Sequence, residues 1–136
     1  MKTAIAIILA IISLANAQLD KPYSYGKAGP NSYDCSGLVY YCFLEEADIE
    51  LPRTAKKIGY CEDYITIETI EELEKGDIVC FNTNRSDGDL SDHVGIYLGD
   101  YDFIHSSSAQ GKVVISTLGE GYYNERFSWG KRVILE

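Results

Sequence analysis

Asp34-Cys35-Ser36-Gly37-Leu38-Val39-Tyr40 is the stretch that decides the fold of this 136-residue chain. Asp34 is a favoured N-cap residue, and the apolar residues that follow as far as Ala47 recur close to every 3.6 positions. The pattern predicts a helix over 36–47 with Cys35 at or beside its N-cap. Free backbone N–H groups and the helix dipole favour the thiolate form of a cysteine at that place.

The chain has two histidines, and both fall in segments typical of strands. His93 precedes the apolar run 94–98, His105 ends the run 102–105, and Gly99-Asp100 between them is typical of a tight turn. In a hairpin whose turn is centred near Gly99, facing residues have numbers that add up to about 198. The sequence therefore predicts that His93 and His105 are cross-strand neighbours on one face of the sheet.

These three residues fit one kind of chemistry. A cysteine nucleophile needs an imidazole to take its proton, and that imidazole needs a further polar group to orient it. The residues thus predict a triad of Cys35, His93 and His105. Two other interpretations stay open here: a buried cysteine with two unrelated surface histidines, and a metal site near Asp92. The histidine and cysteine spacing does not match that of zinc sites, so no metal or other cofactor is expected.

The remaining pattern divides the chain into a helix-rich first half and a strand-rich second half. Residues 18–33 contain many turn formers and predict a loop, 54–59 a short helix, and 68–75 a turn or short helix. Strands are expected at 78–81, 94–98, 102–105, 113–116 and 132–135. The predicted fold is α+β: an N-terminal helix carrying the nucleophilic cysteine packs against an antiparallel sheet of five or six strands.

Residues 1–17 have the features of a secretory signal peptide. Lys2 precedes an apolar run that ends at Leu14, and Ala15-Asn16-Ala17 is a small-residue cleavage site. We expect cleavage after Ala17, which leaves 18–136 as one domain, secreted or in the periplasmic or cell-wall space. A retained anchor is the alternative, but the run is short for a bilayer span, so no stable membrane insertion is expected after cleavage. The net charge of −9 argues against nucleic-acid binding, and we expect a monomer.

Four cysteines in an exported chain are by default typical of two disulfides. A nucleophilic Cys35 permits at most one bridge, among Cys42, Cys61 and Cys80, and the sequence does not assign the pair. Two disulfides would instead fit a stapled, non-catalytic binding module. The number of free thiols therefore separates an enzyme from a binding module.

Several motifs, in this order, resemble those of the NlpC/P60 family, which are papain-like cysteine peptidases of bacterial cell walls. They cover nearly all of 21–136 and are Pro22-Tyr23-Ser24-Tyr25-Gly26, Asp34-Cys35-Ser36-Gly37-Leu38-Val39, Leu51-Pro52-Arg53, Leu73-Glu74-Lys75-Gly76-Asp77-Ile78-Val79, His93-Val94-Gly95-Ile96-Tyr97-Leu98-Gly99 and Phe103-Ile104-His105.

The resemblance implies a papain-like fold and a role for each site residue. Cys35 is the expected nucleophile, His93 the general base and His105 the residue that orients it. Tyr23 is expected to help the Cys35 backbone N–H bind the oxyanion, although simple packing is the alternative for this tyrosine. Asp34 and Ser36 match positions that hold the amino end and the D-Glu part of a peptidoglycan stem peptide. The expected reaction is hydrolysis of the bond between γ-D-glutamyl and the diamino acid, through a thioester.

The chain departs from the family pattern at three places: Lys27 replaces a second glycine, Asp92 replaces a small polar residue before His93, and the loop 82–92 is long. That loop contains the sequon Asn84-Arg85-Ser86, a glycosylation site in a eukaryotic host. The alternative enzyme is a papain-like acyltransferase or amidase with the same Cys-His-His residues. Such an enzyme would act on ester or acyl-lipid substrates.

Overall fold

The computed structural model describes residues 2–135. These residues form four α-helices, one 3₁₀-helix and six strands. In chain order the elements are α1 (Ala4–Asn16), α2 (Cys35–Ala47), α3 (Ala55–Gly59), β1 (Ile65–Ile67), η1 (Ile70–Glu72), β2 (Ile78–Phe81), β3 (His93–Gly99), β4 (Asp102–Ser107), β5 (Lys112–Thr117), α4 (Tyr122–Arg126) and β6 (Phe127–Arg132).

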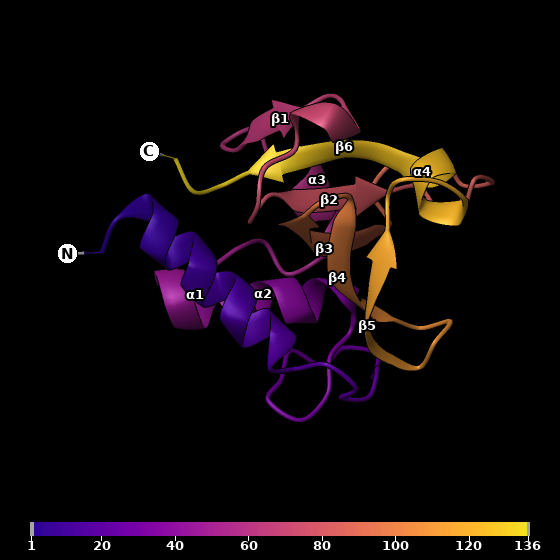
Figure 1. Ribbon diagram of the computed structural model, residues 1–136. Helices are drawn as coiled ribbons and strands as arrows, with labels where there is room; N and C mark the ends of the chain where they lie inside the picture. Colours follow the sequence, from indigo (N-terminus) through magenta and orange to yellow (C-terminus); the bar gives the residue numbers. More distant parts are fainter. Residues whose placement is uncertain (1, 136) are drawn as a thin grey trace.

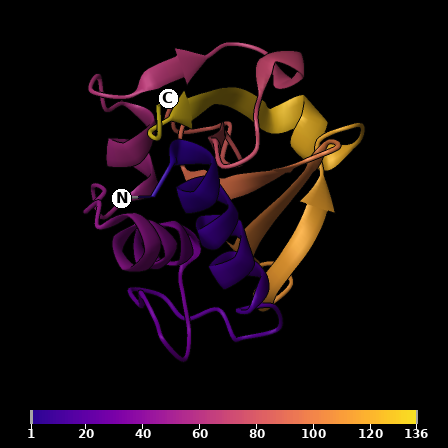
Figure 2. The ribbon, with the colours of Figure 1, turned by 60° about the vertical axis from the view of Figure 1, so that its left-hand side comes forward.

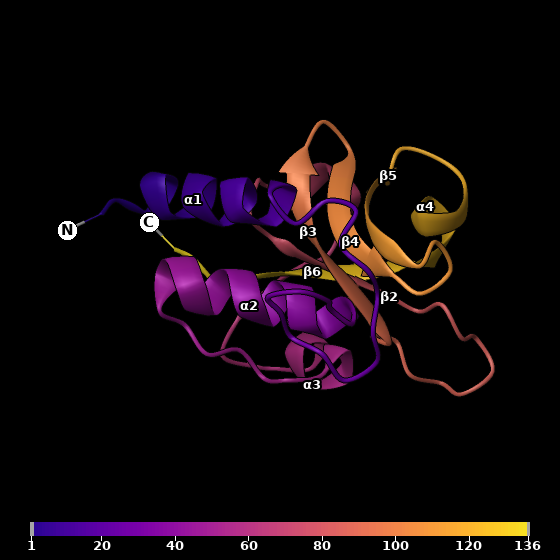
Figure 3. The same ribbon diagram turned by 90° about the horizontal axis from the view of Figure 1, so that it is seen from below.

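The strands form one antiparallel sheet in the order β1-β6-β2-β3-β4-β5. Helices α1 and α2 lie side by side against one face of the sheet, and α4 lies at the other end of the molecule (Figures 1 and 3). Side chains alternate between the two faces, so Val94 and Ile96 join the core under α1 and α2. Tyr97 and Phe103 join a second core on the opposite face. The predicted α+β class is confirmed.

Helix α2 forms as its sequence predicts, beginning one residue earlier. The Asp34 carboxylate caps it by accepting from the Gly37 N–H at 2.6 Å, and Asp48 ends it in the left-handed conformation. Leu38, Val39 and Phe43 are fully buried. Burying a side chain of this size contributes about 1.5–3 kcal/mol, so α2 is fixed in place mainly by its apolar face.

The predicted hairpin exists, but its predicted register is wrong by two residues. Its turn is at Asp100 and Tyr101, which both have positive φ, and Ile96 faces Ile104. The Tyr101 N–H donates to the Tyr97 hydroxyl at 2.9 Å, which holds this unusual turn residue. Because side chains alternate with a period of two, a shift of two residues leaves His93 and His105 on the same face, now as diagonal neighbours.

Other differences concern short elements. The last strand is 127–132 and not 132–135, because Gly130 and Lys131 pair with β2 and β1. The Lys131 ammonium is buried and donates to the Thr66 hydroxyl at 2.8 Å and to the Cys61 carbonyl at 3.1 Å, which satisfies a charged residue inside a strand. The sequence patterns predicted neither β1 nor α4.

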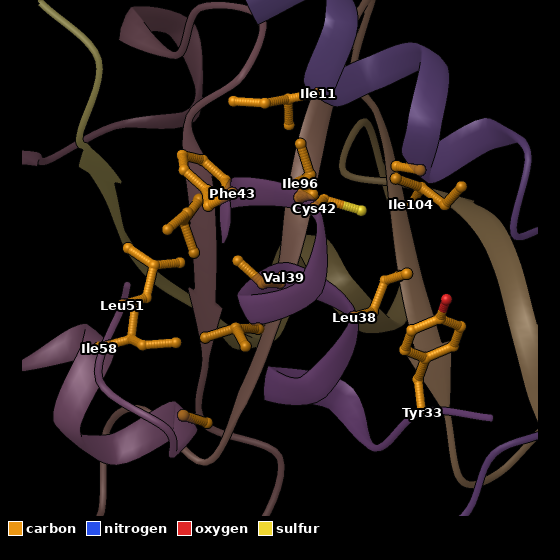
Figure 4. Packing of buried hydrophobic residues seen from close by; sticks show 14 of the residues in the cluster. Ile11, Tyr33, Leu38, Val39, Cys42, Phe43, Leu51, Ile58, Ile96 and Ile104 are labelled. Atoms are coloured by element: carbon orange, nitrogen blue, oxygen red, sulfur yellow. The ribbon is translucent and has the colours of Figure 1, made fainter. Parts of the chain in front are cut away.

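Residues 4–16, predicted to be removed as a signal peptide, form α1 and pack on the domain. Ile11 and Ala15 are fully buried, and Figure 4 shows Ile11 reaching the cluster that contains Phe43 and Ile96. Figure 2 shows α1 running in front of the sheet beside α2. Cleavage after Ala17 stays a prediction. Over residues 2–135, no helix is both long and apolar enough to cross a membrane.

Candidate active site

Cys35 lies in an open cleft of about 500 Å³ at the N-terminus of α2, and Tyr23, Asp34, Ser36 and Arg53 also line this cleft. All four cysteines of the chain are free thiols, so the stapled binding module, which requires two disulfides, is not what this chain forms. Cys35, which the sequence predicts to be the nucleophile, is therefore a free thiol.

Burial decides the protonation state of this thiol. The nearby backbone N–H groups of Val94, Ser36 and Cys35 itself lower the pKa of the thiol, but burial is the larger effect, and the Asp34 charge adds to it. Together they raise the pKa of Cys35 to about 11. The backbone N–H groups at the helix N-terminus thus lower the pKa of Cys35 as expected, but burial outweighs their effect. Val94, whose N–H acts on the thiol, follows His93 directly in β3.

His93 and His105 meet as the triad requires. The Nε2 atom of His93 lies 2.8 Å from Nδ1 of His105. Continuing the β3–β4 register places Gly95 opposite His105, and a Cβ on Gly95 would lie only 3.1 Å from the His105 Cβ. Gly95, two residues after His93 on β3 and opposite His105 on β4, thus leaves room for the diagonal contact. His105 is fully buried, so the interpretation as unrelated surface histidines is wrong.

Both imidazoles are neutral in this environment. Burial lowers the pKa of His93 to about 4, with the Asp92 charge opposing it in part. Burial, and then the neighbouring His93, lower the pKa of His105 to about 3. The rings of Phe103 and Tyr123 pack on His105 with centroids 4.5 and 5.0 Å away, which keeps water from this side of the pair. A neutral His93 beside a protonated thiol is the state in which an imidazole acts as general base.

Tyr23 is held beside the nucleophile by the loop that precedes α2. Its backbone N–H donates to the Gly111 carbonyl at 2.9 Å, and residue 23 bridges to Tyr33. Burial raises the pKa of its hydroxyl, and the charges of Cys35 and Asp34 raise it further, which places the hydroxyl near both. Tyr23 is therefore a protonated hydrogen-bond donor at the cleft.

Asp34 and Ser36 lie in the cleft, but their polar atoms already have partners within the protein. The Asp34 carboxylate forms a bidentate pair with the Arg53 guanidinium, at 3.1 and 3.0 Å, and also accepts from Gly26 and Gly37. The Ser36 hydroxyl donates to the Arg53 carbonyl at 2.8 Å and is nearly inaccessible to solvent. These contacts hold the start of α2 in place against the segment around Arg53.

Asp92, the alternative metal position, caps the loop that precedes β3. Its carboxylate accepts from the Thr83 N–H and hydroxyl, the latter at 2.6 Å, and from the Asn84 N–H at 2.8 Å. The carboxylate is thus occupied in closing the long 82–92 loop.

Sequence reasoning missed two side chains of this site. Arg53 belongs to the Leu51-Pro52-Arg53 motif, but the motif alone does not show that its guanidinium pairs with Asp34. Ser116 had no signal at all: its hydroxyl lies 2.8 Å from Nε2 of His105, which depends on the register between β4 and β5.

Comparisons with known proteins agree with this geometry. The model of the NlpC/P60 family matches residues 20–132. The murein DD-endopeptidase MepH of Escherichia coli is 37% identical over 118 residues, which are 86% of this chain and 42% of MepH. The E. coli murein DD-endopeptidase MepS/murein LD-carboxypeptidase is 33% identical over 82% of this chain and 55% of its own length. The chain thus spans about half the length of these relatives.

A crystal structure of an NLP/P60-family protein from Staphylococcus aureus superposes with a TM-score of 0.80 at 29% identity. The superposition covers 96% of this chain and 42% of the S. aureus chain. The two proteins therefore share the fold over almost the whole of this chain.

Proposed function

The chain belongs to the NlpC/P60 family, and from this premise we propose that it is a secreted cysteine endopeptidase that hydrolyses the peptide stems of bacterial peptidoglycan. The names of its relatives as murein endopeptidases support the substrate class. The observation that carries the proposal is the 2.8 Å contact between His93 and His105, together with a free Cys35 thiol that opens into a cleft and whose pKa the N–H of Val94, the residue after His93, lowers.

The geometry supports a general-base mechanism. Because Nε2 of His93 is engaged with His105, its Nδ1 is the ring nitrogen left to take the Cys35 proton as the sulfur attacks the amide carbon. The C–N bond then breaks, and the same proton goes to the leaving amine. Water next attacks the thioester carbon, His93 takes the proton of this water and returns it to the sulfur, and the acid is released.

Charge that develops on the amide oxygen needs donors at the cleft. The backbone N–H of Cys35 and the Tyr23 hydroxyl are the two groups we assign to this task, since both lie beside the sulfur. Removing one such donor in other hydrolases lowers kcat about 10²–10³-fold. Because Asp34 and Ser36 have internal partners, any contact they make with the stem peptide adds to the contacts with Arg53.

The decisive test of the mechanism is Cys35→Ala. We expect the variant to release no stem fragments from purified peptidoglycan, because no other thiol lies in the cleft. Cys61→Ala is the matched control: Cys61 is also a half-buried free thiol, but it lies in a separate hollow beside Tyr64, so activity should persist. Release of fragments by Cys35→Ala would show that the proposed mechanism is wrong.

For the bond, we propose the link between γ-D-glutamyl and the diamino acid. The relatives are named murein DD-endopeptidase and murein LD-carboxypeptidase, so the test must distinguish the proposed bond from the bond of a cross-link. Mass spectrometry of a defined disaccharide tetrapeptide should show a disaccharide dipeptide product. If the enzyme instead leaves this monomer intact and only splits a cross-linked dimer into monomers, the proposed bond is wrong while the peptidase function stands.

A further inference from the structure

A third side chain continues the histidine pair towards β5. His105 Nδ1 faces His93, and His105 Nε2 lies 2.8 Å from the Ser116 hydroxyl oxygen. Phe103 pairs with Ser116 and His105 with Val114, so Ser116 is the diagonal neighbour of His105 on the same face. A continuous chain of hydrogen bonds thus runs from His93 through His105 to Ser116.

The direction of the protons along this chain follows from the mechanism. For His93 Nδ1 to accept the Cys35 proton, the single proton of the neutral His93 ring must be on Nε2, and it is donated to His105 Nδ1. His105 then carries its own proton on Nε2 and donates it to the Ser116 oxygen. The opposite direction would place a proton on His93 Nδ1, which is the nitrogen that must be free.

We propose that Ser116 is a positioning residue: by accepting from Nε2 of the buried His105, it holds both histidines in the one tautomer that leaves His93 Nδ1 free to act as a base. This inference rests on the proposed peptidase function for its kinetic consequence, but the tautomer itself does not depend on any substrate. The buried His105 N–H needs an acceptor, because a buried donor without one is costly.

The surroundings of His105 leave this role to Ser116. Phe103 and Tyr123 pack on the ring through their faces and edges, and His93 occupies its other nitrogen. The other ionisable groups that line the open hollow on the solvent side of Ser116 are Asp102, Glu120, Tyr122 and Tyr123. Strand β5 is at the edge of the sheet and Ser116 is half-buried, so substitutions there are compatible with the fold.

The kinetic test compares Ser116→Thr with Ser116→Val. The two side chains have the same shape and both suit a strand, but only threonine keeps the hydroxyl. We expect Ser116→Thr to keep nearly the wild-type kcat and Ser116→Val to lose about tenfold in kcat, as for one lost hydrogen bond, with little change in KM. Equal kcat values for the two variants would overturn the inference, since that result means that Ser116 only fills space.

The spectroscopic test does not require activity. The chain has two histidines, so long-range ¹H–¹⁵N spectra of the labelled protein contain two imidazoles, and His93→Gln identifies the signals of His105. We expect His105 protonated on Nε2 in the wild type and in Ser116→Thr, and a mixture of tautomers in Ser116→Val. A wild-type His105 protonated on Nδ1 would overturn the inference, even if Cys35→Ala confirms the peptidase.

Discussion

At the scale of single residues, His105 is unusual because it is an ionisable side chain that is both neutral and fully buried. Its two nitrogens have partners in His93 and Ser116, so the neutral ring is satisfied, whereas a charged ring would face His93 without a counter-ion. The pKa of His105 is lowered to about 3 by burial and by His93. The unfolded chain therefore takes up a proton at a higher pH than the folded one.

This difference makes the folded state sensitive to acid. His105 contributes its full stability above pH 6.5, the ordinary value, and this stability is lost as the pH falls from there towards 3. We expect the free energy of unfolding to fall by about 2 kcal/mol between pH 7 and pH 5 from His105, with His93 acting in the same direction. Urea titrations at the two pH values measure it. His105→Gln should show a smaller difference; an equal difference would rule out His105 as the cause.

At the scale of elements, contacts at the start of α2 position the residues of the candidate site. Asp34, Ser36 and Arg53 join the helix to the segment before α3, and the Tyr23–Tyr33 loop packs on its first turn. Gly37 makes this packing possible: a Cβ there would collide with the Lys27 carbonyl oxygen and would lie 3.0 Å from the Ala28 Cα. Because Gly37 has no side chain, the backbone at Lys27 and Ala28, in the loop that carries Tyr23, can pack directly on the first turn of α2.

Gly37→Ala is therefore expected to destabilise the protein, although alanine normally stabilises a helix by about 1 kcal/mol relative to glycine. The obstructing atoms belong to the backbone, so we expect a loss of about 1–3 kcal/mol in the free energy of unfolding, measured in urea. Gly119→Ala, where the nearest atom is 3.3 Å away, is the control and should change stability by less than about 0.5 kcal/mol. A stabilised Gly37→Ala would contradict the packing described.

The elements also show why sequence patterns predict some parts of this fold and not others. Helix α2 and strands β2 to β5 have a clear period or apolar run, and all were predicted. Strand β1 has three residues and depends on a partner some 65 positions later, and α4 has five residues and no side-chain cap. The proposed role of Ser116 was not predicted either, because it depends on the register between β4 and β5, which sequence patterns do not determine.

For the whole molecule, the predicted papain-like α+β architecture is confirmed: α2 carries Cys35 against a six-stranded sheet, and this arrangement superposes on a solved NLP/P60 structure. The unexpected contribution is that of α1. One side of this apolar helix contributes Ile11 to the main core, while Leu9 on another side is 53% exposed. The segment predicted for removal is thus, in the uncleaved chain, also a packed element.

Two alanine variants of the uncleaved chain test this packing. We expect Ile11→Ala to lower the free energy of unfolding by about 2–5 kcal/mol, because it removes a fully buried side chain. Leu9→Ala, of equal size change on the exposed side, should cost less than about 0.5 kcal/mol. Urea denaturation of both measures the difference, and equal losses would contradict a core role for α1. The intact mass of the exported protein tests cleavage itself: a mass that includes Met1 would show that prediction to be wrong.

The high pKa of Cys35 has a consequence for the durability of the protein. Peroxides and other oxidants attack thiolates, and with a pKa of about 11 only about one resting molecule in ten thousand is a thiolate at pH 7. For an unperturbed cysteine with a pKa of 9.0 the share is about one in a hundred. The burial that raises this pKa thus protects Cys35, the proposed nucleophile, from oxidative inactivation, and in the proposed mechanism the sulfur loses its proton to His93 only as it attacks the substrate.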